Sequence, residues 1–473
     1  MRILLVAHNF LPSHSAGTEV HTGNLARSLK QAGHDVEVLA AEKDVARIDM
    51  TVVRREWCGV PVVEIINNLY HAAFAQTWER AEIDQLFEHE LERFRPDVVH
   101  FQHLLYLSVG CVERAAQRAA VAFTLNDFWL QCPRMGQLLH PDGSICWTID
   151  HQRCGECLTS FKHAQTPLQR ATGRAIAGVK SALGVDLSRA AKAAAHSLQP
   201  APATARDGAA PVDRVLAATL AREAAERNAA MLERVVPNVD GFVAPSRFLM
   251  QRFIAWGVRP ERIEHLLYGL DTRAFPRGAR TATAGRGSGP LRVGFFGTFA
   301  PHKGAHLLIE AWGRLAADVR ALARLSLRGP SSASAEYRRS LESLARSAGA
   351  ELAGPVAHDE LATHLGGLDL LVVPSLWVEN APLVILEARA VRTPLLVSDI
   401  GGMAELVEPL VHGEHFRAGD VSDLTRALEG LLRARERLAS FYATGHSVRT
   451  CEDDARDHER LYERILARRS RPD

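Results

Sequence analysis

The sequence lacks any long run of apolar residues. Its N-terminal apolar run extends only from Ile3 to Ala7, which is too short for a secretory signal peptide, and no other run is long enough to span a bilayer. The formal net charge is +1, which gives no electrostatic case for binding nucleic acid. Seven cysteines in 473 residues do not suggest a secreted disulfide scaffold. We therefore expect a cytoplasmic protein with no nucleic-acid partner.

The sequence is long enough to form more than one hydrophobic core. At 473 residues two or three domains are expected. Hydrophobic residues make up 47% and charged residues 23% of the chain, which are globular values. Residues 2–7 and 35–40 read as buried strands, joined by a loop and a helix over residues 24–32. This order predicts a Rossmann-like α/β domain.

The loop after the first strand lacks the G-x-G-x-x-G fingerprint of dinucleotide-binding domains, because Ala7, His8, Asn9 and Phe10 occupy its place. A dinucleotide-dependent dehydrogenase is therefore disfavoured. Gly17 stands just before the predicted helix, where a glycine lets backbone N–H groups approach an anion at a helix N-terminus. An ordinary loop glycine is the alternative interpretation.

The most informative stretch is DLLVVPSLWVENAPLVILEARAVRTPLLVSDIGG. A buried-strand pattern leads to a loop with Glu379, a helix from Pro382 carries Glu387, and a second strand is followed by Gly401 and Gly402. In an open parallel sheet, ligands bind at the carboxyl ends of the strands. Two carboxylates there can accept hydrogen bonds from the vicinal hydroxyls of a sugar or a ribose. Two solvated surface glutamates are the alternative, which the surrounding pattern disfavours.

A glycine-rich turn follows the predicted strand LRVGFFG. Gly297, Lys303 and Gly304 stand between this strand and the next predicted helix. Such a turn suits a diphosphate, because backbone donors and one mobile point charge face the anion. A surface lysine in a turn is the alternative interpretation, and the nearby pair of glutamates weakens it.

Two predicted strands of the N-terminal half end in polar residues. PDVVHFQH places His100 and His103 near its exit, and AVAFTLNDFW ends in Asn126 and Asp127. Because parallel strands end at the same sheet edge, we expect these side chains near the loop that holds Gly17. An asparagine can hydrogen-bond but cannot carry a positive charge.

Four cysteines, Cys132, Cys146, Cys154 and Cys157, fall within 26 residues. Clustered thiols in a reducing compartment suggest a structural zinc site. The spacing C-x13-C-x7-C-x2-C matches no standard zinc finger. Four reduced thiols, two of them in a core, are the alternative interpretation.

Composition also predicts where the domains divide. Residues 276–290, PRGARTATAGRGSGP, show no apolar periodicity and read as a linker. We predict an N-terminal Rossmann-like domain of residues 1–275, with a Cys-rich and Ala-rich insertion at about 130–236. A C-terminal Rossmann-like domain is predicted over residues 291–445, followed by a helix within 446–473.

These motifs together resemble the retaining glycosyltransferases of family four, the glycosyl transferases group 1, in a bacterial form with a cysteine-containing insertion. Glu379 and Glu387 match the E-x7-E signature of that family, and Gly17-Thr18-Glu19 resembles its G-[GT]-E loop. The resemblance implies a GT-B fold, in which two Rossmann-like doubly wound parallel-sheet domains face a cleft. The N-terminal domain would take the acceptor, the C-terminal domain the nucleotide sugar, and the last helix would pack back on the N-terminal domain.

The resemblance also implies roles for individual residues. Glu379 would hold the hydroxyls of the donor sugar, Glu387 those of the ribose, and Lys303 the diphosphate. Glu379, Lys303 and Asp127 are the implied catalytic residues. Amides that head a helix at Gly401 would add dipole stabilisation. The implied nucleotide-sugar site consists of Gly17, Gly297, Thr298, Lys303, Arg328, Glu379, Asn380, Ala381, Pro382, Leu383, Glu387, Gly401 and Gly402.

The chain departs from the family pattern at two positions. Thr298 stands where the family has an arginine on the phosphates, and Arg328 or His302 is expected to supply the missing cation, with Arg328 preferred. Asn126 stands where the family often has a histidine before Asp127.

The implied activity is transfer of a sugar from a UDP- or GDP-sugar to a glycan or lipid-linked glycan acceptor, with retention of configuration and without a catalytic metal. The resemblance places it in surface polysaccharide or glycoconjugate synthesis, with contact at the inner face of the membrane. Two alternatives stay open. One is a non-catalytic GT-B scaffold that binds carbohydrate or a partner protein, favoured by Thr298 and Asn126. The other is a GT-B epimerase or phosphorylase.

Overall fold

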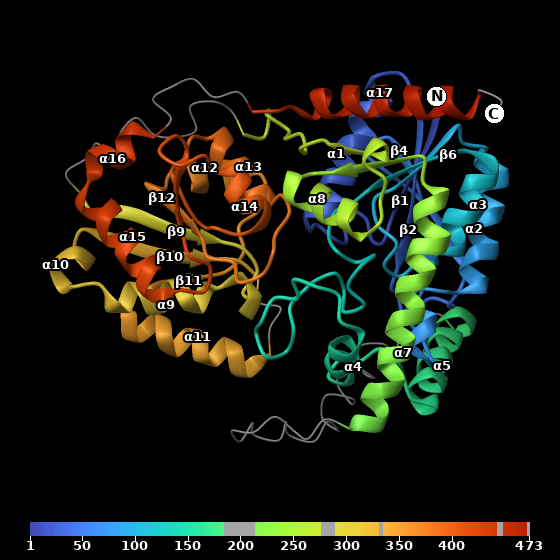
Figure 1. Ribbon diagram of the computed structural model, residues 1–473, viewed down its shortest axis with the longest axis horizontal. Coiled ribbons are helices and arrows are strands. Elements are labelled where there is room, and N and C mark those ends of the chain that lie inside the picture. Colours follow the sequence, from blue (N-terminus) through green and yellow to red (C-terminus); the bar gives the residue numbers. More distant parts are fainter. Residues whose placement is uncertain (184–212, 276–288, 331–333, 442–447, 471–473) are drawn as a thin grey trace. The chain divides into compact units, whose positions relative to one another are not determined.

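The chain forms two compact α/β units, each built around one β-sheet (Figure 1). The computed structural model describes residues 1–183, 213–275, 289–330, 334–441 and 448–470. Unit 1 takes in Met1–Val243, Phe253–Glu264 and Ala455–Asp473, and unit 2 takes in Ala244–Arg252 and His265–Asp454. The predicted α/β class with two sheet domains is confirmed. Most of the predicted linker, residues 276–288, lies outside the described residues.

The sheet of unit 1 has eight strands in the order β3-β4-β2-β1-β5-β6-β7-β8. The strands are β1 Arg2–Ala7, β2 Asp35–Glu42, β3 Val52–Trp57, β4 Val60–Ile66, β5 Val98–Phe101, β6 Ala120–Thr124, β7 Gly241–Ala244 and β8 Ile263–His265. The neighbours from β4 to β7 run parallel, whereas β3 pairs antiparallel with β4. The sequence pattern does not predict β3, whose charged residues Arg54, Arg55 and Glu56 are typical of an edge strand.

Helices cover this sheet on both faces, with α1 on one side and α2 and α3 on the other (Figure 1). The helices of unit 1 are α1 Gly17–Gln31, α2 Ala81–Phe94, α3 Gly110–Arg118, α4 His151–Thr159, α5 Pro167–Leu183 and α7 Arg214–Ala230. Helix α8 Arg247–Trp256 is divided between the two units after Arg252. Our predicted start of the first helix at residue 24 is wrong, because α1 already begins at Gly17. Gly17 is therefore the first helical residue, and Ala16 before it provides no side-chain cap.

The last helix, α17 Cys451–Arg469, is held to the sheet of unit 1 by polar contacts along its second half. The Tyr462 hydroxyl lies 2.7 Å from Nδ1 of His100, and Glu459 lies 2.7 Å from Nε2 of His34. No described helix has the length and apolar character needed to cross a bilayer.

The sheet of unit 2 has six strands in the order β11-β10-β9-β12-β13-β14. The strands, parallel throughout, are β9 Leu291–Phe296, β10 Ala323–Arg328, β11 Glu351–Ala353, β12 Leu370–Val373, β13 Leu395–Ser398 and β14 Gly413–Phe416. The helices of this unit are α9 Ala305–Arg314, α10 Ala317–Arg320, α11 Ala335–Ala348, α12 Leu361–Gly366, α13 Leu383–Ala390, α14 Gly401–Leu406, α15 Val421–Arg433 and α16 Arg435–Ser440. Both β12 and β13 are fully buried, as continuous apolar runs predict for central parallel strands.

Candidate functional site

Two loops meet at the carboxyl ends of β9 and β12 in unit 2. The chain leaves β9 through Gly297, forms a single 3₁₀ turn over Pro301–Lys303, and enters α9 after Gly304. Gly304 has a φ of 72°, and a side chain there would collide with the carbonyl oxygen of Pro374. Only glycine lets this turn lie so close to the loop that follows β12. The amide of Leu376 donates to the carbonyl of His302 at 2.8 Å and ties the two loops together.

This arrangement brings Lys303 and Glu379 into direct contact. The Lys303 ammonium lies 2.8 Å from Oε1 of Glu379, and the Ser375 hydroxyl donates to the same oxygen at 2.6 Å. The ammonium also lies 5.2 Å from the ring centroid of Trp377. Burial by itself would raise the pKa of Glu379, but Lys303 and the hydroxyl outweigh it, so its pKa is lowered. Glu379 is therefore a fixed, ionised acceptor.

Glu387 lies on α13, is only 6% exposed, and has no side-chain hydrogen bond among the described residues. Burial raises the pKa of this carboxyl to about 7. The helix itself begins at Leu383, one residue later than predicted, with Pro382 as its N-cap. A buried carboxyl without a partner is costly in a folded protein, so hydroxyl donors of a ligand would satisfy it.

The glycine pair shapes the opposite side of the loop that holds Glu379. Gly401 has a φ of 60°, and a side chain at Gly402 would overlap the carbonyl of Asn380. The amide of Gly402 donates to the carbonyl of Glu379 at 2.8 Å, so it fixes the loop instead of facing a ligand. The predicted dipole stabilisation at this helix start therefore stays a prediction, and the Gly402 amide contributes to it from within the loop. Ala381 is buried in the same loop.

Of the two residues expected to replace the missing arginine at Thr298, His302 and Arg328, Arg328 is the one that can supply a positive charge. Burial and the neighbouring Lys303 lower the pKa of His302 to about 4, so this ring is neutral at pH 7. Arg328 ends β10 and pairs in register with Phe296, immediately before the turn. Its guanidinium lies 3.6 Å from Glu351, whose side chain is exposed, so this ion pair is easily given up. Arg328 stays the predicted second cation.

In unit 1, Asp127 and His103 form a hydrogen-bonded pair at the ends of β6 and β5. Nε2 of His103 lies 3.1 Å from Oδ2 of Asp127, and Nδ1 accepts from the amide of Leu105 at 2.9 Å. These contacts define a tautomer with its proton on Nε2, donated to the carboxylate. Asn126 instead donates to the carbonyl of Gln102 at 2.6 Å.

A second histidine–carboxylate pair lies beside the first, and our sequence analysis did not assign it. Nε2 of His8, just after β1, lies 3.3 Å from Glu19 in the first turn of α1, and the His8 ring lies 4.5 Å from that of His103. Burial lowers the pKa of His8 and raises the pKa of Glu19. The place of His8 directly after a buried strand was the available signal.

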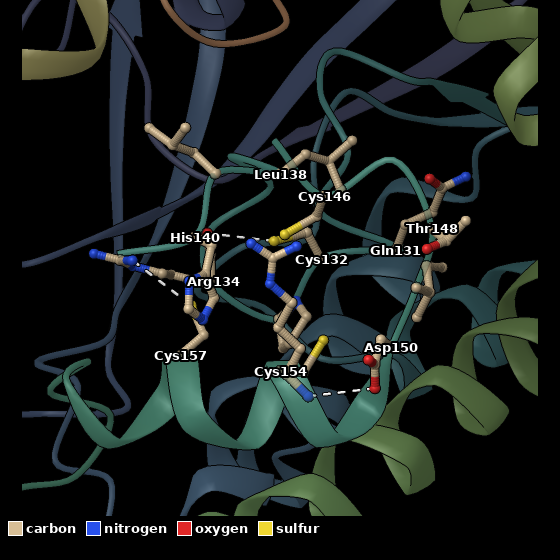
Figure 2. A pocket seen from close by; sticks show the side chains of 14 residues that line it. Gln131, Cys132, Arg134, Leu138, His140, Cys146, Thr148, Asp150, Cys154 and Cys157 are labelled. Atoms are coloured by element: carbon tan, nitrogen blue, oxygen red, sulfur yellow. Dashed lines mark hydrogen bonds between the residues drawn. The ribbon is translucent and has the colours of Figure 1, made fainter. Parts of the chain in front are cut away.

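The four clustered cysteines line one cavity of about 30 Å³ in unit 1 (Figure 2). Cys154 and Cys157 come from α4, and Cys132 and Cys146 come from the loop before it. Burial raises the pKa of Cys132 to about 11 and that of Cys154 to about 12. Among the described residues, no three His, Cys, Asp or Glu side chains are grouped to hold a metal ion. The donors suit zinc, but the thiols do not form a ligand set as they stand.

We keep structural zinc as a prediction. Besides the thiols, His140 lines the cavity, with Nδ1 3.0 Å from Asp142 and a buried Nε2 that has no hydrogen bond among the described residues. A carboxylate behind a free imidazole nitrogen is typical of metal-bound histidines. Elemental analysis of the untagged protein is expected to find about one zinc per chain, because binding deprotonates the thiols and draws them together. Metal-free protein, or full stability of the quadruple Cys→Ser variant, would remove the prediction.

Two family models match the chain in the halves that hold these groups. The model described as "Glycosyl transferase 4-like domain" matches residues 16–152, and "Glycosyl transferases group 1" matches residues 282–447. The second match contains the Lys303–Glu379 contact and Glu387. The chain belongs to the glycosyl transferases group 1. The family resemblance in the sequence is thereby confirmed.

Curated relatives cover part of the chain. A D-inositol 3-phosphate glycosyltransferase from Geodermatophilus obscurus is 34% identical over 220 residues, which is 44% of this chain and 49% of the relative. A protein of the same name from Nocardia farcinica is 30% identical over 216 residues, 44% of this chain and 48% of the relative. The chain thus spans about half the length of the curated relatives it matches.

Solved structures share the fold over nearly the whole chain. Anabaena HepE in complex with UDP and glucose has a TM-score of 0.60 at 14% identity, covering 98% of this chain and 99% of that one. Sucrose-phosphate synthase from Thermosynechococcus elongatus also has a TM-score of 0.60, at 16% identity, covering 99% and 100%. At such identities the likeness establishes the GT-B fold.

Proposed function

We propose that this protein is a retaining glycosyltransferase that moves a hexose from a nucleotide sugar to a glycan or lipid-linked glycan acceptor, in surface polysaccharide or glycoconjugate synthesis. The observation that carries the proposal is the Lys303–Glu379 contact of 2.8 Å, with Glu387 buried on the helix that follows and without a hydrogen-bond partner in the part of the chain that the structure describes. A cation, an ionised acceptor and a second buried carboxyl are the groups that a diphosphate, a sugar and a ribose require.

In this proposal unit 2 binds the donor. Lys303 turns from Glu379 toward the diphosphate, and its charge offsets the negative charge that grows on the leaving oxygen as the sugar departs. Arg328 supplies the second cation. Glu379 accepts hydrogen bonds from sugar hydroxyls, and Glu387 from ribose hydroxyls. UDP is the first nucleotide to test, because UDP is bound in the solved structure of HepE.

Unit 1 binds the acceptor. Asp127 contacts His103 and Glu19 contacts His8, and the two histidine rings can orient an acceptor hydroxyl. Transfer with retention leaves the departing phosphate oxygen to take the acceptor proton. A lipid-linked acceptor would place the reaction at a membrane surface.

The rival functions predict different products. A non-catalytic scaffold binds nucleotide or carbohydrate and releases nothing, and an epimerase changes the donor without an acceptor. The release of free nucleoside diphosphate from UDP-glucose and GDP-mannose, measured with and without a mixture of glycan acceptors, is expected to rise several-fold when acceptor is present. A nucleoside diphosphate that neither binds in a thermal-shift assay nor is released would contradict the proposal.

A further inference from the structure

Unit 1 contains a second cavity, of about 280 Å³, whose lining by described residues includes three cations and no Asp or Glu side chain. Arg227 of α7 lies against this cavity, and Lys43 and Lys162 lie at it from two loops. Both lysines are exposed and form no ion pair among the described residues. The cavity is thus lined by positive charge that carboxylates do not balance.

Arg227 is the decisive residue, because its charge is buried and its guanidinium has no carboxylate partner among the described residues. It is 2% exposed, and among the described residues its hydrogen-bond acceptors are the carbonyls of Trp129, at 2.6 Å, and Leu130, at 3.4 Å. The guanidinium lies 4.4 Å from the ring centroid of Trp129. Burial lowers its pKa to about 10, which still leaves it charged at pH 7.

A buried charge normally has a counter-ion, because removing a charge from water costs several kcal/mol that only a partner offsets. Cys132, Asp127 and Cys154 each raise the pKa of Arg227. Both thiols are uncharged at pH 7, because burial raises their pKa to about 11 and about 12, and the Asp127 carboxylate is engaged by His103. His71 in the same lining is neutral at pH 7, because burial lowers its pKa to about 4. Its Nε2 is buried and has no hydrogen bond within the described ranges of the chain. The cavity is therefore built for a ligand that carries negative charge and hydrogen-bonding oxygens.

We propose that this cavity binds a phosphate-type oxyanion carried by the acceptor substrate. This inference rests on the proposed function, in which unit 1 takes the acceptor. Trp129 lines this cavity and belongs to the loop after β6. Its amide donates to Asp127 at 2.7 Å, so an anion in the cavity would lie next to the histidine–carboxylate pairs. Planar guanidinium and two mobile ammonium groups together suit a dianionic phosphate better than a single carboxylate.

Calorimetric titration tests the inference in the full chain carrying Lys303→Ala, which silences the proposed diphosphate site. Two arms distinguish the source of the anion: inorganic phosphate and glucose 6-phosphate as free ligands, and phosphatidylcholine vesicles with and without undecaprenyl phosphate. Arg227→Met and the double variant Lys43→Met/Lys162→Met are compared with Arg222→Met, which removes an exposed arginine from the same helix.

Arg227→Met and Lys43→Met/Lys162→Met, the two pocket variants, are each expected to weaken binding of the phosphate ligand about 10- to 100-fold, because each removes charge-assisted hydrogen bonding. Arg222→Met should leave phosphate binding unchanged. If Arg227→Met does not fold, the double lysine variant alone decides. Binding in neither arm, or equal binding by all variants, overturns the inference. UDP binding to the pocket variants with intact Lys303 separates this inference from the proposed function. These variants should still bind UDP. An unmodified chain that fails to bind UDP would contradict the proposed function and not this inference.

Discussion

Turnover is expected to fall about 100- to 1000-fold when Lys303 is replaced by alanine, the loss seen when one preorganised donor is removed from a developing negative charge. The reason lies in the 2.8 Å contact with Glu379, which holds the ammonium at the carboxyl end of β9 before substrate arrives. Negative charge on the diphosphate grows as the sugar departs, so the interaction strengthens in the transition state and appears in kcat. With Thr298 in place of an arginine, Lys303 carries more of this charge, and the loss should lie at the upper end.

Steady-state kinetics with the true donor measure this effect. Lys30→Ala, an exposed lysine of α1, is the matched control and should retain wild-type turnover. Thr298→Arg is expected to keep or raise activity, because it restores a second cation in the turn. Wild-type kcat in Lys303→Ala would show that the diphosphate binds elsewhere, and the assignment of motifs in unit 2 would be withdrawn.

Glu387→Gln should stabilise the unliganded protein at alkaline pH and weaken donor binding at the same time. Burial raises the folded-state pKa of Glu387 from 4.5 to about 7. Between these values the unfolded chain loses the proton first, so the folded state binds more protons and stability falls as pH rises. Above pH 7 the full penalty applies, about 3 kcal/mol for a shift of this size, and glutamine avoids it.

Unfolding in urea at pH 5 and pH 8 measures the first effect, with the stability difference between Glu387→Gln and wild type growing by about 2.5 kcal/mol across this range. Titration with UDP at pH 8 measures the second, and binding should be about 10- to 100-fold weaker because the carboxylate accepts the ribose hydroxyls. Glu436→Gln on α16, an exposed glutamate, is the control for both. A variant that loses no UDP affinity would leave Glu387 without its assigned role.

The elements that form the candidate donor site could be predicted from local sequence. Continuous apolar runs give β12 and β13, because both strands are buried on both faces. The loop with Glu379 and the helix with Glu387 follow in order. The family resemblance added the roles of these residues, which periodicity does not contain.

Contacts between distant segments could not be predicted in this way. Lys303 and Glu379 are 76 residues apart, and they meet because β9 lies beside β12 in the sheet, an order set by crossover connections and not by local pattern. Arg227 lies in the Ala-rich part of the predicted insertion, and only the packed structure shows it buried against Trp129. The amide of Gly402 is likewise committed to the loop before it.

A crystal structure of the chain with UDP tests the central claim most directly. The account predicts phosphate oxygens within hydrogen-bonding distance of the Lys303 ammonium and ribose hydroxyls on the carboxylate of Glu387, with Arg328 turned from Glu351 toward the diphosphate. A nucleotide bound away from Lys303 and Glu387 would contradict it.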